Sequence, residues 1–485
     1  MNARIPAPVL DAPQVLREVS NAWDQDIVGQ LSDYIAIPAK SPMFDAEWET
    51  HGHLERVVQN TAAWIEAQRV PGLRLEVVRL PGQTPVLFFE VDATRSTAQT
   101  VLMYGHLDKQ PEFSGWRTDL GPWTPKYQDG LLFGRGGADD GYAAYAAIAA
   151  IQALKSQQQT HPRIVGLIET CEESGSPNLL QYIDTLGPRL GDVGLVVCLD
   201  SGAGNYDQLW LTNSLRGVAG GVLKVQILTE GVHSGDASGL VPSSFRIMRQ
   251  LLDRLEDSAT GRLLPAEFHC EIPSERLAQA RATAAILGEA VYRYFPWAHY
   301  DCDGGKTFAL PTTTDPLQGL LNRTWLPTLS VVGVDGFPDM KDAGNVLRPF
   351  TAFKLSLRLP PLVEAHSAVQ QLKRLLEDNA PYQARVTFEP GGQATGWNAP
   401  ASTAWFEKAL DEASQTYFGA PCGYIGQGGT IPLMNMLSQG FPKAQMMVCG
   451  VLGPKSNAHG PNEFLHVPYA KKLTAAVAHV LAQCP

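Results

Sequence analysis

Between residues 100 and 200 the chain alternates short apolar runs with helix-period segments, and this alternation constrains the fold more than any other feature. The runs at 100–104, 163–169 and 193–200 have the length and composition of buried strands. The alanine-rich segment 140–155 and the segment 177–186 between them have helical character. Strands that are apolar on both faces and alternate with helices are typical of a parallel sheet covered by helices. We therefore predict an α/β fold with a mostly parallel sheet.

The pattern changes after about residue 215 and returns at about 400. "GVLKVQILTEG" alternates apolar and polar residues as an antiparallel strand does, and a helix at 242–257 and a loop-rich stretch to about 328 follow. A chain of 485 residues also exceeds what one hydrophobic core usually serves. We predict a catalytic domain in two parts, 1–214 and 390–485, interrupted by a two-layer α+β domain at 215–389.

Composition excludes several classes of partner. The net charge is -11 and no block of Lys and Arg is present, which argues against a surface for nucleic acid or an anionic membrane. No run approaches the roughly 18 apolar residues of a membrane span, and the N-terminal segment lacks the apolar core of a secretory signal. The seven cysteines are scattered without a CxxC pair, as in a cytoplasmic protein with reduced thiols. Small solutes are the expected partners.

Polar residues follow several of the predicted strands, at the point where each strand ends. In a parallel sheet the carboxyl ends of the strands share one edge, so these residues should converge in one crevice. The candidates are His106 and Asp108 after the first strand, Asp139 before the alanine-rich helix, Glu172 and Glu173 after the second strand, Asp200 after the third, and His459 in a C-terminal loop.

The candidates form a metal-ligand set. Carboxylates packed at short range cannot all ionise without a counter-charge, and divalent cations supply one. Imidazole and carboxylate ligands without thiolate are typical of a hydrolytic centre, with Zn favoured and Mn or Co as alternatives. These groups are more than one four-coordinate ion needs, which favours two ions about 3.5–4 Å apart that share a carboxylate.

Five ordered motifs resemble those of a known family, the M20 metallopeptidases, and are most similar to the carnosinase-like dipeptidases. The resemblance runs from about residue 100 to the C-terminus, with an insertion in the expected place. The motifs are "GHLDKQP", "FGRGGADDGY", "ETCEESGS", "CLDSG" and "NAHGPNE".

The resemblance implies a role for each candidate. The metal ligands would be His106, Asp139, Glu173, Asp200 and His459, with Asp139 bridging two ions and a water or hydroxide between them. Glu172 would be the general base that takes a proton from that water and delivers it to the departing amine. Asp108 would lie behind His106 and fix the tautomer of its imidazole.

The inserted domain would act as a lid and mediate a homodimer. In "EGVHSGDASG", His233 would stabilise the oxyanion, in its own subunit or in the neighbour's. Asn345, Arg358, Gly429 and Thr430 would bind the substrate, for which a guanidinium is suited because it pairs with a carboxylate through two bonds. The chain departs from the family at Gly141, where Lys is common, and at Gly426, where Arg is common.

Single residues of this set also have simpler interpretations. Asp139 and Asp140 also suit the first turn of a helix, and a lone His at a strand end is usually structural, but five such coincidences would be needed together. On the same scaffold an N-acyl-amino-acid deacylase or a carboxypeptidase would use identical chemistry. A non-catalytic binding protein would have no use for Glu172. The sequence therefore predicts hydrolysis of an amide bond in dipeptides or other small peptides.

Overall fold

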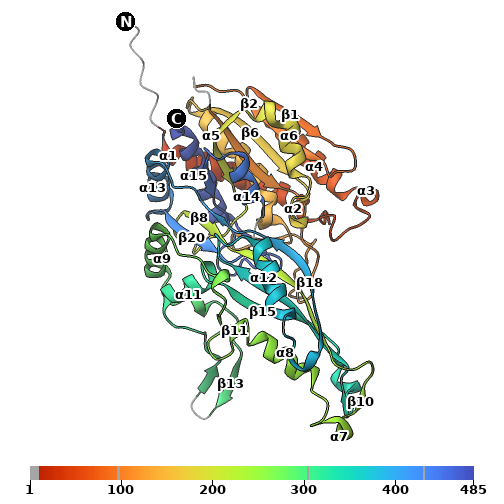
Figure 1. Ribbon diagram of the computed structural model, residues 1–485. Coiled ribbons are helices and arrows are strands. Elements are labelled where there is room, and N and C mark those ends of the chain that lie inside the picture. The colour runs from red at the N-terminus through yellow and green to blue at the C-terminus, as the bar shows by residue number, and fades with distance from the viewer. Residues whose placement is uncertain (1–9, 96–98, 303–304, 430–431) are drawn as a thin grey trace. The chain divides into compact units, whose positions relative to one another are not determined.

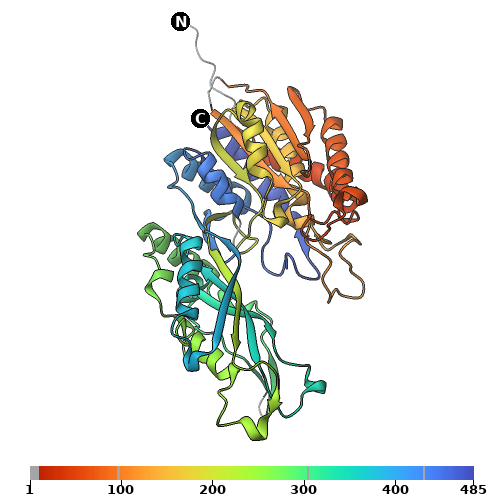
Figure 2. The same cartoon turned by 45° about the vertical axis from the view of Figure 1, so that its right-hand side comes forward.

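The computed structural model describes residues 10–95, 99–302, 305–429 and 432–485 (Figures 1 and 2). Its contacts divide the chain into two compact units. Unit 1 comprises Met1–Thr212, Ala399–Ile425 and Met436–Pro485, and unit 2 comprises Asn213–Asn398 and Gly426–Asn435. The border predicted near residue 390 falls inside strand β18 (Arg385–Ala394), which pairs with β9 (Gly217–Gln226) of unit 2. A strand cannot leave its sheet in mid-course, so unit 2 extends beyond that border.

Unit 1 is built on a six-stranded sheet with the strand order β1-β2-β6-β3-β7-β21. Strands β6, β3, β7 and β21 run parallel, while β1 and β2 are antiparallel at one side. The prediction of a mostly parallel sheet is confirmed. The strands are β1 Leu73–Val78, β2 Val86–Val91, β3 Gln99–His106, β6 Arg163–Glu169, β7 Asp192–Cys198 and β21 Gln445–Val448.

Helices cover this sheet, and α5 (Tyr142–Ser156) lies at the centre of the packing. It contacts β3 on one side and α1, α4 and α15 on others, and nearly every side chain from Tyr142 to Leu154 is buried. The alanines make this close approach possible because they add little volume between the packed elements. The other helices of unit 1 are α1 Ala12–Ala22, α2 Val28–Ile35, α4 His53–Ala67, α6 Leu179–Leu190, α13 Ala404–Phe418 and α15 Val467–Gln483.

A small second sheet in unit 1 joins two distant parts of the sequence. Strand β5 (Leu131–Phe133) pairs with β4 (Lys126–Gln128) and with β22 (Phe464–His466), and Phe464 lies opposite Phe133. The chain enters the turn toward Asp139 directly after β5, and the loop with His459 ends directly before β22. This pairing therefore brings the two loops together.

Unit 2 is a two-layer α+β structure, as predicted. Its main sheet is antiparallel with the order β15-β17-β9-β18, and helices α8 (Ser244–Leu252) and α12 (Ala365–Glu377) pack on it. Its core includes Leu223, Phe268, Leu355, Leu372 and Phe388, all almost fully buried. The remaining long strands are β15 Thr328–Asp335 and β17 Phe350–Leu359.

The stretch predicted to be loop-rich up to residue 328 contains the short helix α10 (Ala290–Arg293) and two longer helices. These are α9 (Ser274–Leu287) and α11 (Pro316–Thr324), which pack against each other. Prediction missed α9 because "SERLAQARATAAIL" has no continuous apolar stripe, and α11 because it is short and surrounded by Pro and Thr. In the described part of the chain, no helix has the length and apolar character required to cross a membrane.

Candidate metal centre

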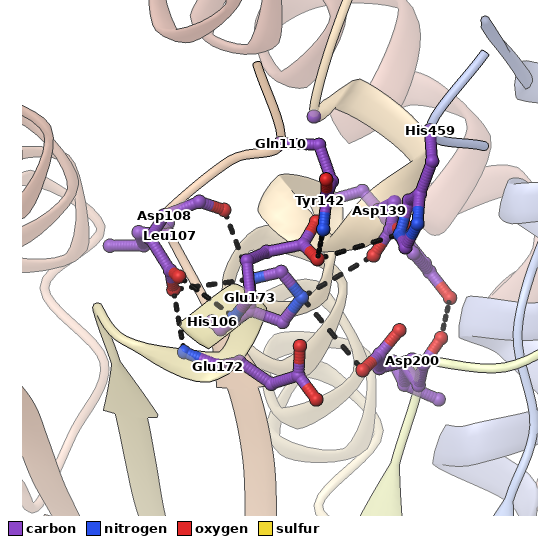
Figure 3. A network of polar contacts seen from close by, with 12 residues as sticks. His106, Leu107, Asp108, Gln110, Asp139, Tyr142, Glu172, Glu173, Asp200 and His459 are labelled. Atoms are coloured by element: carbon purple, nitrogen blue, oxygen red, sulfur yellow. Dashed lines mark hydrogen bonds and ion pairs between the residues drawn. The ribbon is translucent and has the colours of Figure 1, made fainter. Parts of the chain in front are cut away.

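The site lies at the carboxyl edge of the parallel strands in unit 1. Strand β3 ends at His106, which lies opposite Glu169 at the end of β6. The loops that follow β3, β6 and β7 carry Asp108, the pair Glu172–Glu173, and Asp200 respectively. Figure 3 shows these side chains directed toward one another, together with Asp139 and His459. The convergence expected from a parallel sheet is present.

The predicted ligands form two groups that share one carboxylate. The ligand atoms of His106, Asp139 and Asp200 lie within 4.8 Å of one another, and so do those of Asp139, Glu173 and His459. The first group is buried, whereas His459 in the second is exposed. His459 Nε2 lies 2.9 Å from Asp139 Oδ2 and 3.4 Å from Glu173 Oε2. Each group could hold a metal ion, and Asp139 is common to both.

His106 has the hydrogen bonding of a metal ligand. Its Nδ1 donates to the backbone carbonyl of Asp108 at 3.1 Å, which leaves Nε2 with a free lone pair. Nε2 is buried, has no hydrogen-bond partner among the described residues, and lies 3.4 Å from Asp139 Oδ1 and 3.8 Å from Asp200 Oδ2. A buried acceptor that faces two carboxylates is satisfied by a cation, so the donor set fits a divalent metal.

The carboxylate of Asp108 has a task that the sequence did not show. It lies 3.4 Å from His106 Nδ1, and it also accepts the backbone N–H groups of Glu172 (3.1 Å) and Glu173 (2.9 Å). These are charge-assisted hydrogen bonds, which are stronger than neutral ones. Asp108 therefore holds the loop that carries both the candidate base and a candidate ligand.

The crowded carboxylates perturb each other's pKa values. Burial and the charge of Asp139 raise the pKa of Asp200 to about 7 and raise that of Glu173 well above its usual range. Burial and the charge of Asp200 raise the pKa of Glu172 in the same way. Burial also acts to raise the pKa of Asp139, but the neighbouring imidazoles of His106 and His459 lower it overall. Cations in the site remove this repulsion, because they attract the charged form of every carboxylate.

Gln110 is a residue of the site that sequence analysis missed. Its side-chain Nε2 donates to Glu173 Oε2 at 2.6 Å (Figure 3). The bond fixes the orientation of the Glu173 carboxylate beside His459. Gln110 stands two positions after Asp108, but an amide in a polar loop carries no signal of such a contact.

The two departures from the family pattern lie in tightly packed places. A Cβ atom at Gly141 would be 2.2 Å from Cε1 of Tyr34, so the Tyr34 ring occupies the space of a side chain there. A Cβ atom at Gly426 would be 2.7 Å from Oγ of Ser214 and 3.0 Å from Cβ of Thr324. A side chain at either position would therefore force its neighbours to shift.

The remaining predicted residues belong to unit 2. His233 ends β10 (Val232–His233), and its exposed ring accepts the N–H of Gly235 at 3.1 Å. Asn345 is close by, since its carbonyl accepts the N–H of Ser234 at 2.9 Å. Arg358 lies half-buried in β17, and burial lowers its pKa. Gly429 is exposed, while Thr430 lies outside the described residues.

Arg216, another residue of unit 2 that the sequence did not single out, holds the segment before Gly429. Its backbone N–H donates to the carbonyl of Gln427, and its Nε donates to the carbonyl of Gly428. Its Nη1 donates to Thr328 Oγ1 at 3.1 Å.

Comparison with known proteins agrees with this site. The model of peptidase family M20/M25/M40 matches residues 102–483. The chain is 27% identical to a cysteinylglycine-S-conjugate dipeptidase of Corynebacterium striatum, over 85% of this chain and 88% of that protein. It is 26% identical to a Beta-Ala-His dipeptidase of Homo sapiens, over 90% of this chain and 86% of that protein. The crystal structure of human carnosine dipeptidase 1 superposes with a TM-score of 0.74 at 24% identity, covering 99% of this chain and 100% of that one.

The fold, the ligand groups and the family match agree. The chain belongs to peptidase family M20/M25/M40 and is a metal-dependent peptidase. The fold of unit 1, with acidic and imidazole side chains at the carboxyl edge of its sheet, is the fold of that class.

Proposed function

We propose that this protein is a dipeptidase that hydrolyses the amide bond of small peptides at a centre of two divalent metal ions. The observation that carries the proposal is the pair of ligand groups that share Asp139. His106, Asp139 and Asp200 would hold one ion, and Asp139, Glu173 and His459 the other. The nitrogen and oxygen ligands favour Zn, with Mn or Co as alternatives.

When bound, the ions supply polarisation of the scissile carbonyl and acidification of a water molecule. The chain's own residues supply the proton transfers and the positioning. Glu172 takes the proton of the attacking water and returns it to the departing amine. Figure 3 shows its carboxylate extending below the His106 ring on the side of Asp200, while its backbone is held by Asp108.

Residues of unit 2 complete the proposal. His233 is exposed and carries a ring nitrogen that can donate to the oxyanion of the tetrahedral intermediate. Arg358, with Asn345, Gly429 and Thr430, would bind the carboxylate of the substrate. A guanidinium suits a free C-terminal carboxylate because it offers two parallel N–H donors.

The class of substrate is inferred from the relatives. One is a cysteinylglycine-S-conjugate dipeptidase and another is a Beta-Ala-His dipeptidase, so we infer a dipeptide for this chain. An N-acyl-amino-acid deacylase and a carboxypeptidase remain the alternatives, because they differ from a dipeptidase only in the walls of the pocket. We also infer a cytoplasmic protein, since six of the seven cysteines are free thiols.

The proposal is tested by elemental analysis of the purified protein together with a substrate panel. We expect about two divalent ions per chain, loss of activity with a chelator and recovery with Zn or Mn. The panel compares dipeptides, longer peptides and N-acyl amino acids. Preference for an N-acyl amino acid would select the deacylase, and full activity in metal-free protein would refute the mechanism.

We further infer a homodimer that forms through unit 2. Strand β15 lies at the end of the strand order of its sheet and exposes Val331, Val332 and Val334 at 46%, 57% and 64%. An exposed apolar edge strand is a template for pairing with another strand, and antiparallel pairing of two β15 strands is self-complementary. Val334→Lys should shift the protein to a monomer in sedimentation velocity. A wild-type monomer would refute the inference.

A further inference from the structure

Beside the candidate metal centre lies a buried ion pair that none of the proposed roles uses. Arg135 is 1% exposed and Glu463 is fully buried, and Nη1 of Arg135 donates to Oε2 of Glu463. The two residues are separated by 328 positions in the sequence. A buried pair of this kind is weak evidence for stability, because removal of both charges from water offsets much of their attraction. It therefore calls for another explanation.

The pair joins three loops of the centre, which carry Gln110, Asp139 and His459. Arg135 donates from Nη2 to the carbonyl of Gly460 at 2.8 Å and from Nε to the carbonyl of Pro111 at 3.2 Å. Glu463 Oε1 accepts the N–H of Gly136 at 2.9 Å. Gly460 directly follows His459, Pro111 directly follows Gln110, and Gly136 stands three residues before Asp139. Two of these bonds thus end directly beside a residue of the centre, and the third ends on the turn that leads to Asp139.

The loop that holds His459 needs such an anchor. His459 has a φ of 64°, and Lys455, Asn457 and Asn462 of the same loop also have positive φ. Non-glycine residues in the left-handed region are held there only when the surroundings fix them. His459 is exposed, so packing of its own side chain does not supply this constraint. The constraint comes from the bonds that Arg135 and Glu463 make on the C-terminal side of His459.

Two aromatic rings flank the guanidinium. Cζ of Arg135 lies 5.9 Å from the ring centroid of Phe113 and 5.7 Å from that of Trp116. Contacts of a guanidinium with ring faces add attraction and keep water from its donors. The bonds to the loops are therefore not readily exchanged for bonds to water.

We propose that Arg135 and Glu463 are positioning residues that set His459 in place, so that Asp139, Glu173 and His459 can bind the second ion. The inference rests on the proposed function, since it assumes that these residues are ligands. It predicts a selective effect. Loss of the pair weakens the ion held by His459 and leaves the ion at His106, Asp139 and Asp200 nearly unchanged.

The experiment is a calorimetric titration of metal-stripped full-length protein with Zn²⁺ alone. The wild type should bind two ions, and a wild type that binds none refutes the proposed function itself. Arg135→Lys keeps the positive charge, but an ammonium group cannot make all the hydrogen bonds of the guanidinium. Glu463→Gln keeps the shape of the side chain but removes its negative charge. In each variant one of the two affinities should fall roughly 10–100-fold, the usual effect of losing a group that orients a ligand.

Arg163→Lys is the matched control. Arg163 also pairs with a carboxylate, that of Glu90, and also donates to two backbone carbonyls, but its partners lie away from the centre. It should leave both Zn²⁺ affinities unchanged, and circular dichroism should show that each variant is folded. Equal weakening of both ions in Arg135→Lys and Glu463→Gln, no weakening in either, or the same selective loss in Arg163→Lys would overturn the proposal.

Discussion

At the scale of single residues, the proposed chemistry depends most on Glu172. Its backbone N–H is bonded to Asp108, so Glu172→Gln keeps the loop in place and removes only the proton acceptor. We expect kcat to fall by roughly 10²–10⁴-fold, the usual contribution of a general base. Metal content measured by elemental analysis should stay at the wild-type value. Wild-type turnover in this variant would show that another group accepts the proton.

Glu169, at the end of β6, gives a prediction of pH dependence. Its Oε1 accepts hydrogen bonds from Tyr104 Oη (2.7 Å) and Ser176 Oγ (2.8 Å). Burial, together with the charge of Asp108, raises its pKa from 4.5 to about 7. The folded protein therefore binds this proton more tightly than the unfolded chain does. The free energy of unfolding should fall as the pH rises from about 4.5 to about 7, by the order of 3 kcal/mol at 1.36 kcal/mol per pKa unit.

The variant Glu169→Gln isolates this contribution, because its amide does not titrate. Denaturant unfolding of both proteins between pH 4.5 and 7.5 should show a steeper loss of stability in the wild type, and the difference between them measures the effect of Glu169 alone. Parallel curves would mean that the carboxyl group is ionised in the folded protein throughout this range.

Sequence analysis could point to His106, Asp139, Glu173, Asp200 and His459 because each stands at the end of a recognisable strand or in a recognisable motif. The structure brings all five together, and their roles stay predictions. Gln110, Arg135 and Glu463 lie within the same motifs, but the motifs give no sign of what these side chains contact. Their partners are tens to hundreds of residues distant, and only the completed fold makes the contacts visible.

At the scale of elements, the fit between α2 and the start of α5 is tight at Gly141. The Tyr34 ring that fills the space is fixed by its hydroxyl, which donates to Leu107, and by Lys109, whose Nζ donates to the Tyr34 carbonyl at 2.7 Å. Gly141→Ala should therefore lower the free energy of unfolding by about 1–3 kcal/mol, as overpacking does. Chemical denaturation measures the change.

Gly29 in α2 provides the matched control. It is an exposed glycine of the same helix, and a Cβ atom there meets nothing within 4 Å. Gly29→Ala should raise the free energy of unfolding by up to about 1 kcal/mol, because alanine favours the helix. The two substitutions are chemically identical, so opposite signs would identify the Tyr34 contact as the cause. Equal effects would contradict it.

The elements themselves were predictable where one physical signal dominated. Strand β6 matches the predicted bounds 163–169, because a short, continuously apolar run has few other uses. Helix α9 was missed because its sequence has no apolar stripe, and α11 because it is short and flanked by Pro and Thr; the two helices pack against each other. The second domain border was misplaced within β18, where the polar and glycine-rich end of the strand resembles a linker.

At the scale of the whole molecule, the centre and the core of unit 2 belong to different compact units. Removal of metal should therefore destabilise the loops of unit 1 and leave the core of unit 2 unaffected. Without cations, Asp139, Glu173 and Asp200 repel one another in a largely buried site, and the loops that carry them should open. Ions present at 100 times their dissociation constant stabilise the folded state by about 2.7 kcal/mol, and the same amount is lost on chelation.

Hydrogen exchange of individual peptides, with and without a chelator, measures where this loss falls. We expect faster exchange in the loops at 107–112, 136–141, 170–175 and 456–463 of unit 1, because their backbone bonds depend on the geometry of the centre. The strands β9 and β17, whose side chains pack in the separate core of unit 2, should exchange at an unchanged rate. Uniform acceleration across both units would mean that the cations stabilise the protein globally, whereas no acceleration in the four loops would mean that they do not bind where the carboxylates meet.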